Sequence, residues 1–548
     1  MSWLLYERVF PGTAGFCAEA KAASASVFGW GVSNTRVMKN ISIFVFYLFV
    51  LSGVSNALDV NAFPGAEGSG RFATGGRGGA VYEVTNLSNS GTGSIVDAVS
   101  QANRTIVFRV SGTIPLGSVI LQPKSNITIA GQTAPGDGIC LKGRIQIKNS
   151  AHDIVIRYIR IRVDAGGAND NGDAIDIASG NNIIIDHVTA SYGRDETISC
   201  EEDANNVTVQ WCIMSEALTF EGHSYGSLVR GNTGGAKTYH HNLYAHNQER
   251  NPRPGNYSAI GDDPEGLHFD FRNNVTYNWE GSVSGYNDDY TGKVSRYNFI
   301  GNDFIRGPES TSGSYVFRES SIDANGYFAD NAKDDVVPTG LSGQWVLVYF
   351  NPVYFISTDL INRYKASALV PMEPVTTTSA AQAKIDVLAD AGASYPRRDI
   401  IDNRIVKDVL NKTGHSIRDT NVQPEGAWPA LNSRPALADS DHDGMPDIWE
   451  TSHGLNPNNI SDGNGHDLDP DYTNLEIYLD WLVSSVRTDI VYDGVVDFYD
   501  FARFAEHWNT SAGNPLYNER YDFDPDGMIS MDDLFYIAQD WLTPGLEY

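Results

Sequence analysis

The sequence is poor in cysteine, poor in basic residues and nearly free of long apolar runs. Only four of the 548 residues are cysteines, without CxxC spacing, which argues against a disulfide scaffold and against a structural zinc site. Lysine and arginine total 39 against 68 aspartates and glutamates, a net charge of −29. Because nucleic-acid phosphates carry the same sign, we expect no nucleic-acid partner. A single apolar run excludes a protein with several membrane spans.

That single run lies near the start of the chain. Residues 41–53 are largely apolar, follow Lys39 and end before the small residues Ser55 and Ala57, a pattern typical of a secretory signal peptide. The run is shorter than the roughly 20 residues of a membrane span, although an anchor is the alternative. We expect residues 1–57 to be a signal-peptide region with translation starting at Met38, and the protein to be secreted, extracellular or at the cell surface.

Removing this region leaves an odd number of cysteines. Cys140, Cys200 and Cys212 remain. We expect them to be buried free thiols, with a Cys200–Cys212 disulfide as the alternative.

Short strand-like runs recur at a regular spacing over the first half of the chain. They start 24 to 31 residues apart, at Asn126, Asp153, Asn182, Asn206, Lys237, His268 and Val294. One short strand per repeat of this length is typical of a repeat architecture, and no amphipathic helix separates the runs, which argues against βαβ units. We predict an all-β solenoid of parallel strands over 58–436, with asparagines at several repeat heads stacked as a ladder. A β-sandwich with irregular loops is the alternative.

The stretch 300–436 is less regular. An aromatic-rich segment spans 345–355, and helices are indicated over 377–392, with Ser379 as a cap, and over 404–411. We expect late coils of the solenoid and a packed cap, because the end of a solenoid must be covered.

From Leu437 to the end, the chain carries 24 acidic residues against three arginines and no lysine, which marks a separate module. Its first part has the oxygen spacing of an EF-hand calcium loop, with Gly444 at the turn. We predict a calcium-binding linker over 437–485, with the ligands Asp439, Asp441, Asp443, Asp447 and Glu450.

The last part, 486–548, contains two further loops of this kind, 33 residues apart, each followed by a helical stretch. Their predicted ligands are Asp489, Asp493, Asp497 and Asp500 in the first loop, and Asp522, Asp524, Asp526, Ser530 and Asp533 in the second. The duplicated loop–helix unit resembles dockerin type I modules, which implies a cohesin-like or cell-surface partner. The alternatives are a calcium-stabilised spacer and a merely solvated acidic tail.

Candidate functional residues are concentrated between residues 170 and 255. In a solenoid of such coils, Asp173 and Asp195 would face one another across stacked turns and form a calcium site, with Arg250 about two coils away. Structural roles are the alternative: the aspartates as turn residues, the arginines as surface ion-pair partners, and Asp186-His187 as a structural pair that a strand carbonyl orients.

Several ordered motifs are similar to those of secreted pectate lyases of polysaccharide lyase family one. They are AFPGAEG at 62–68, TGGRGG at 74–79, VSGTI at 110–114, AGQTAPGDG at 130–138, IRYIRIR at 156–162, GRDET at 193–197 and RNP at 250–252. The resemblance covers roughly 60–410. It implies a right-handed parallel β-helix and a calcium-dependent activity on pectate.

The resemblance also implies roles for individual residues. Arg250 matches the arginine that acts as base, and Asp173 and Asp195 match calcium ligands. Ser199 stands where a second acid is expected, so Glu196 is the candidate that replaces it. Arg253 and His187 are candidates for substrate binding. We expect a monomer.

The implied reaction is β-elimination. Calcium would bridge the acidic protein and the acidic uronate, and a base would remove the proton at C5. A β-helix polygalacturonase, which is a hydrolase, and a non-catalytic glycan-binding β-helix are the alternatives.

Overall fold

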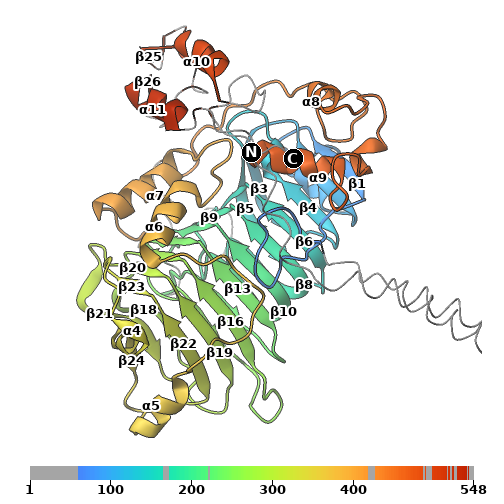
Figure 1. Ribbon diagram of the computed structural model, residues 1–548. Coiled ribbons are helices and arrows are strands. Elements are labelled where there is room, and N and C mark those ends of the chain that lie inside the picture. The colour runs from blue at the N-terminus through green and yellow to red at the C-terminus, as the bar shows by residue number, and fades with distance from the viewer. Residues whose placement is uncertain are drawn as a thin grey trace, which may run out of the picture. The chain divides into compact units, whose positions relative to one another are not determined.

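The chain winds as a parallel β-helix between residues 80 and 350 (Figure 1). The computed structural model describes residues 60–164, 172–219, 222–417, 426–484, 488, 496–511, 513–514, 516–518, 521, 523, 527–539 and 541. The chain divides into two compact units, 1–59 and 60–548, and all described residues belong to the second. The predicted signal-peptide region therefore lies outside the described residues.

Three walls of parallel strands form the β-helix. The first wall contains every one of the seven predicted runs. Its strands are β1 (Ala80–Val84), β2 (Arg104–Phe108), β4 (Ile127–Ala130), β6 (His152–Arg157), the second half of β8 (Ile175–Asp186), the second half of β10 (Ile198–Gln210), β13 (Ala236–His240), β16 (Leu267–Arg272), β19 (Ser295–Ile300) and β22 (Ala324–Ala329). The predicted parallel solenoid is confirmed, and the β-sandwich is excluded.

The second wall is built from strands of two or three residues. They are β7 (Arg160–Arg162), β9 (Thr189–Ser191), β11 (Ile213–Ser215), β14 (Leu243–Ala245), β17 (Val275–Tyr277), β20 (Asp303–Ile305) and β23 (Ala332–Lys333). These strands are too short to give an alternating pattern that sequence reading can detect.

The third wall carries the long loops. It contains parts of β3 (Gly112–Leu121) and β5 (Ile139–Ile147), the first halves of β8 and β10, β12 (Leu228–Arg230), β15 (Arg253–Gly255), and the sheet of β18 (Gly281–Asn287), β21 (Ser310–Glu319) and β24 (Val348–Phe350). Within β8 and β10 the chain runs from the third wall into the first wall, and it then enters the second wall.

A two-residue corner joins the first wall to the second. Its first residue has a left-handed backbone, with φ of 51° at His187 and 53° at His241. Its second residue is asparagine in four successive coils: Asn242, Asn274, Asn302 and Asn331. Each asparagine side chain accepts a hydrogen bond from the backbone N–H of the corresponding residue in the coil before it. The buried backbone at this corner is thus satisfied from coil to coil.

A second ladder forms where the third wall passes into the first. The Nδ2 atom of Asn206 donates to Asn182 (3.1 Å), and that of Asn182 donates to Asp153 (3.4 Å). Each of these residues has a positive φ, which asparagine and aspartate tolerate better than other residues. The predicted ladder at the repeat heads is confirmed.

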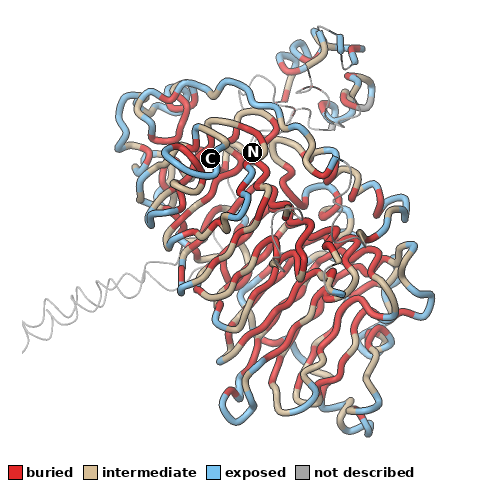
Figure 2. The backbone as a smooth tube through the Cα atoms, turned by 180° about the vertical axis from the view of Figure 1, so that it is seen from behind, coloured by how far each residue is buried: buried red, intermediate tan, exposed pale blue. Residues whose placement is uncertain are grey.

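Apolar side chains fill the space between the walls. Isoleucine and valine dominate the early coils, whereas Phe269, Phe271 and Phe299 fill the later ones. Figure 2 shows the strands as largely buried and the loops between them as exposed. Cys140, Cys200 and Cys212 are buried free thiols, as predicted.

Two of the predicted helices cover a side of the β-helix and not its end. α6 (Ala380–Asp390) is capped by Ser379, as predicted, and α7 (Ile400–Asn411) starts four residues earlier than expected because Asp399 caps it. Val387, Ile405 and Val409 pack against the outer face of the second wall. The short helix α4 (Gly340–Gln344) is followed by η3 (Trp345–Leu347) and α5 (Thr358–Tyr364), whose Trp345 and Tyr364 supply aromatic cover for the last coil.

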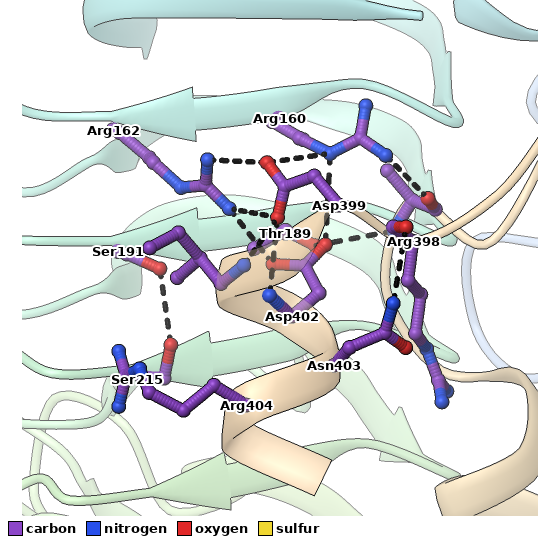
Figure 3. Close-up of polar contacts among 12 residues, drawn as sticks. Arg160, Arg162, Thr189, Ser191, Ser215, Arg398, Asp399, Asp402, Asn403 and Arg404 are labelled. Atoms are coloured by element: carbon purple, nitrogen blue, oxygen red, sulfur yellow. Dashed lines mark hydrogen bonds and ion pairs between the residues drawn. The ribbon is translucent and has the colours of Figure 1, made fainter. Parts of the chain in front are cut away.

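A buried ion-pair cluster fastens α7 to the second wall (Figure 3). Arg162 donates to Asp399 (2.6 Å) and Asp402 (2.9 Å), and Arg160 lies 3.4 Å from Asp399. Thr189 completes the cluster by donating to Asp402 (2.8 Å). Both arginines are fully buried, so removal of one partner leaves an uncompensated charge.

The acidic segment 437–484 packs on the first coils of the β-helix. It contains α8 (Asp447–Ser452), η4 (Asp462–Asn464) and α9 (Asn474–Ser484). Met445, Trp449 and Leu475 form a core cluster with Ala130, and Arg77 pairs with Glu476 (2.8 Å). This segment is thus a packed part of the β-helix surface.

The C-terminal segment contains α10 (Phe498–Ala505), β25 (Thr510–Ser511), β26 (Met528–Ile529) and α11 (Met531–Gln539). β25 and β26 pair antiparallel, and Val496, Phe504, Ile529 and Ile537 form its core cluster. Among all described residues, no helix combines the length and the apolar character that a membrane span requires.

We predict that Asp399→Asn lowers the free energy of unfolding at pH 7 by about 3–5 kcal/mol, because Arg160 and Arg162 lose buried countercharge. Burial opposes ionisation of Asp399, but the two arginines outweigh it and hold its pKa below its usual range. The stabilisation is complete above the unfolded-state pKa of about 3.9 and is lost as the pH falls below it.

Urea unfolding followed by circular dichroism at pH 7 and at low pH measures both effects. Asp262→Asn, which removes an exposed carboxylate, is the matched control. Equal losses for the two variants at pH 7 would contradict the role of the cluster.

Candidate functional site

Three carboxylates lie together where two successive coils enter the third wall. Asp173 precedes β8, and Asp195 and Glu196 precede β10. One oxygen of each lies within 4.8 Å of those of the other two, a spacing that suits a shared cation. The structure therefore brings together the three residues that the sequence indicated as ligands.

Hydrogen bonds position Asp173 within this group. One of its oxygens accepts from the backbone N–H of Glu196 (2.9 Å), and the other accepts from the hydroxyl of Ser199. Ser199, at the position where a second acid was expected, thus donates to Asp173 and does not extend the set of carboxylates. Asp173 and Glu196 are both buried.

Arg250 lies beside the carboxylates and is held from several sides. Its guanidinium pairs with Glu196, lies 3.6 Å from Asp195, and donates through Nε to the hydroxyl of Tyr286 (3.3 Å). The ring of Tyr225 lies 4.0 Å from the guanidinium carbon. A backbone φ of 57° at Arg250 directs the chain into β15.

The electrostatics of the group favour a cation. Burial raises the pKa of Asp173 well above its usual range, and the neighbouring Glu196 raises it further. Burial also raises the pKa of Glu196 to about 7, although Arg250 opposes this rise. Burial works against the charge on Arg250, but Glu196 outweighs it and raises the pKa of the guanidinium. Arg250 pairs with only two of the three acids, Asp195 and Glu196, and a divalent cation would balance the remaining negative charge.

Coil stacking explains why these residues meet. Glu196 forms a parallel bridge with Tyr225, and Tyr225 forms one with Glu249, so three coils are in register just before the third wall. Each residue comes from a different loop, 24 to 29 residues apart in the chain.

Arg253, a predicted substrate-binding residue, belongs to β15 on the same wall. Its guanidinium carbon lies 5.2 Å from the ring centre of Tyr286, and its Nε is buried without a hydrogen-bond partner. Tyr286 therefore contacts both Arg250 and Arg253.

Sequence reading missed three aromatic residues of this site. Tyr225 and Tyr286 contact Arg250, and His223 pairs with Asp195 (2.5 Å). For Tyr225 the repeat spacing was a usable signal, because this residue lies one coil after Glu196 and forms a bridge with it.

His187, the other predicted substrate-binding residue, occupies a different corner of the coil. Its ring stacks between Tyr158 (4.6 Å) and Trp211 (5.8 Å), and its nitrogens pair with Asp186 (2.8 Å) and Asp390 of α6 (3.3 Å). These contacts tie the first corner to α6. Although His187 is close in sequence to Asp173 and Asp195, it is half a coil away from the wall that holds them.

The predicted linker ligands divide into two groups. Asp441, Asp443 and Glu450 place carboxylate oxygens within 4.8 Å of one another, and Asp462 of η4, which sequence reading missed, joins them. Asp439 instead accepts hydrogen bonds from the backbone of His442 and Gly444, and Asp447 accepts them from Ser440.

Most predicted ligands of the C-terminal loops lie outside the described residues; these are Asp489, Asp493, Asp522, Asp524 and Asp526. Asp497 caps α10, and Asp500 completes its capping box. Asp533 accepts from the backbone of Ser530 (2.7 Å) and Phe523 (2.5 Å).

Comparisons with known proteins identify close relatives. Residues 65–260 match the family model described as pectate lyase. The chain is 39% identical over 426 residues to a probable pectate lyase C of Aspergillus fumigatus, which covers 77% of this chain and 94% of the relative. It is 38% identical over 445 residues to a probable pectate lyase C of Aspergillus terreus, covering 80% and 98%.

Solved structures give more distant matches. The cedar-pollen allergen jun a 1 aligns with 60% of this chain and 92% of its own, at 17% identity and a TM-score of 0.42. A pectate lyase bound to a hexasaccharide aligns with 62% and 99%, at 15% identity and a TM-score of 0.40.

We predict that His187→Gln destabilises the protein by about 1.5–3 kcal/mol at pH 6 and by less at pH 10, because a charged hydrogen-bonded group is lost. Burial lowers the pKa of His187, but Asp186 and Asp390 outweigh it and raise the pKa to about 9. The stabilisation is therefore complete below the unfolded-state pKa of about 6.5 and disappears as the pH rises through 9.

Urea unfolding at the two pH values measures this difference, and the same variant should leave the chemistry of the Asp173–Arg250 site unchanged at pH 7. Unaltered stability combined with lost activity would instead assign His187 to substrate binding.

Proposed function

This chain belongs to the pectate lyase family, and we propose that it is a secreted, calcium-dependent enzyme that cleaves polygalacturonate by β-elimination. One observation carries the proposal: buried carboxylates from two coils converge beside the guanidinium of Arg250. An arrangement with a cation site and a base side by side suits removal of a proton next to a carboxylate.

We assign the calcium ligands to Asp173, Asp195 and Glu196. Carboxylate oxygens are the ligands that calcium prefers, and here three of them are close enough to share one ion. Bound there, calcium would attract the uronate carboxylate to an acidic protein and make the proton at C5 more acidic.

Arg250 is the proposed base. It would take the proton from C5 of the uronate, and the electrons of the C5–H bond would form the C4–C5 double bond. The C4–O bond would break at the same time; its electron pair leaves with the oxygen, which takes a proton from solvent water. Arginine accepts a proton only in its neutral form, which its ion pair with Glu196 disfavours. Release of Glu196 from Arg250 is therefore part of the proposed reaction.

The surrounding residues hold and orient these groups. Tyr286 and Tyr225 fix the guanidinium of Arg250 from two sides, and Ser199 holds the carboxylate of Asp173. Arg253, with a buried and unpaired Nε, is suited to bind a second uronate carboxylate.

The C-terminal module is proposed to attach the enzyme to a cohesin-like or cell-surface partner. Its two helices present apolar side chains to solvent, among them Phe498, Tyr499, Phe535 and Tyr536. Exposed aromatic groups of this density on a small module suit a protein partner.

We predict that Arg250→Ala lowers kcat on polygalacturonate by about 10²–10⁴-fold, the range for loss of a general base. Ultraviolet absorbance of the unsaturated product measures elimination directly. Arg363→Ala, which removes an exposed arginine, is the control and should retain activity. New reducing ends without this absorbance would mean hydrolysis and would contradict the proposed reaction.

We predict that Asp173→Asn raises the calcium concentration for half-maximal activity by about tenfold or more, because the site loses a charged ligand. Activity in the wild type should vanish in chelator and return with calcium. Full activity in chelator would remove the metal from the mechanism, and an unchanged calcium dependence in the variant would exclude Asp173 as a ligand.

A further inference from the structure

The second carboxylate group of the molecule lies in the acidic segment, apart from Asp173 and Arg250. It consists of Asp441 and Asp443 from one loop, Glu450 from α8 and Asp462 from η4. The elements that carry these residues contact the first wall at its opening coils, whereas Asp173 and Arg250 lie on the third wall.

Five carboxylate oxygens of this group are buried and have no hydrogen-bond partner among the described residues. Both oxygens of Glu450 are unpaired although the residue is fully buried, and the others are Oδ2 of Asp441, Oδ2 of Asp443 and Oδ1 of Asp462. Unpaired buried carboxylates are strongly unfavourable without a counter-ion. A divalent cation satisfies several converging acceptors at once and also balances their charge.

The remaining oxygens of the three aspartates hold the loops in place. Asp443 accepts from the backbone of Met445 (2.9 Å), and Asp462 accepts from that of Asn456 (3.0 Å). Asp441 accepts from the backbone of Asp443 (3.3 Å). Each aspartate thus uses one oxygen to shape its loop and leaves the other for the common centre.

Two glycines permit this approach. Gly444 has a φ of 94°, which turns the loop between Asp443 and α8. A Cβ atom at Gly463 would lie 2.7 Å from Oδ2 of Asp443, so only glycine lets η4 bring Asp462 to the group.

The loops that form the group also attach the acidic segment to the β-helix. His442 pairs with Glu83 of β1 (2.9 Å), and Arg109 donates to the carbonyl of Leu437 (2.5 Å). The side-chain amide of Asn464 donates to the carbonyl of Gly79 (3.1 Å). These loops therefore supply polar contacts that help to hold the acidic segment on the first coils.

We propose that Asp441, Asp443, Glu450 and Asp462 bind a structural calcium ion that fastens residues 437–484 to the first coils of the β-helix. The ion joins two loops that contact β1 and the chain before it, so its loss weakens the attachment of both loops to this surface. An all-oxygen, multiply charged site selects calcium over softer metals. This site is separate from the proposed catalytic one and does not depend on it.

The test uses the full chain, stripped of metal and titrated with calcium chloride, with Glu450→Gln as the variant. Thermal unfolding should show a calcium-dependent rise of the midpoint by about 2–5 °C in the wild type, most of which the variant loses. Isothermal titration should count one ion fewer in the variant. Asp262→Asn is the control and should behave as the wild type.

The unfolding temperatures of the variant and the wild type in chelator and in calcium distinguish a metal ligand from an acid with a purely structural role. In chelator, Glu450→Gln should unfold at the same temperature as the wild type or above it, because an unpaired buried charge has been removed. In calcium it should unfold below the wild type. Lower stability of the variant in both conditions, or an equal calcium response and ion count in both proteins, would overturn the proposal.

Two further variants complete the design. Asp462→Asn, a substitution in η4, should give the same result as Glu450→Gln. It takes the place of Glu450→Gln if Glu450→Gln does not fold. Asp173→Asn should keep the calcium-dependent midpoint while it changes catalysis, whereas Glu450→Gln should keep kcat below its unfolding temperature. Loss of the midpoint shift in Asp173→Asn alone would assign the stabilising ion to the other site.

Discussion

Coil-to-coil hydrogen bonding is the constraint on which the rest of this structure depends. Each inner strand of the first wall pairs in parallel with the strands before and after it, as β8 does with β6 and β10. One residue out of register would turn an inward isoleucine such as Ile183 outward. The ladders and the ring stack at the corners keep that register, because these asparagine and ring contacts join matching positions of neighbouring coils.

The same register builds the proposed active site. Loops that leave successive coils at one height must end side by side, so Glu196, Tyr225 and Glu249 lie in a row although 53 residues of chain separate the first from the last. The long loops of the third wall can vary without disturbing the core, since the pairing of the strands carries the fold. Arg250 and the carboxylates lie in the loops that lead into that wall.

A high density of acids recurs in both proposed cation sites. In each, burial and neighbouring carboxylates raise pKa values, to about 7 for Glu196 and to about 8 for Asp443. The sites differ in their balance of charge: Arg250 offsets part of the charge at the first, whereas the second group consists of carboxylates alone. We therefore expect the first ion to exchange during use and the second to be held as part of the fold.

The sequence by itself determined the solenoid, the ladder at Asn182 and Asn206, and the convergence of Asp173 with Asp195, because the spacing of repeats sets which residues share a height. Only the tertiary structure decided the position around the coil: His187 is close in sequence to Asp195 but points into a corner stack. It also decided that Asp462 replaces Asp439 and Asp447 in the acidic group, since that choice depends on how η4 packs, which no local spacing encodes.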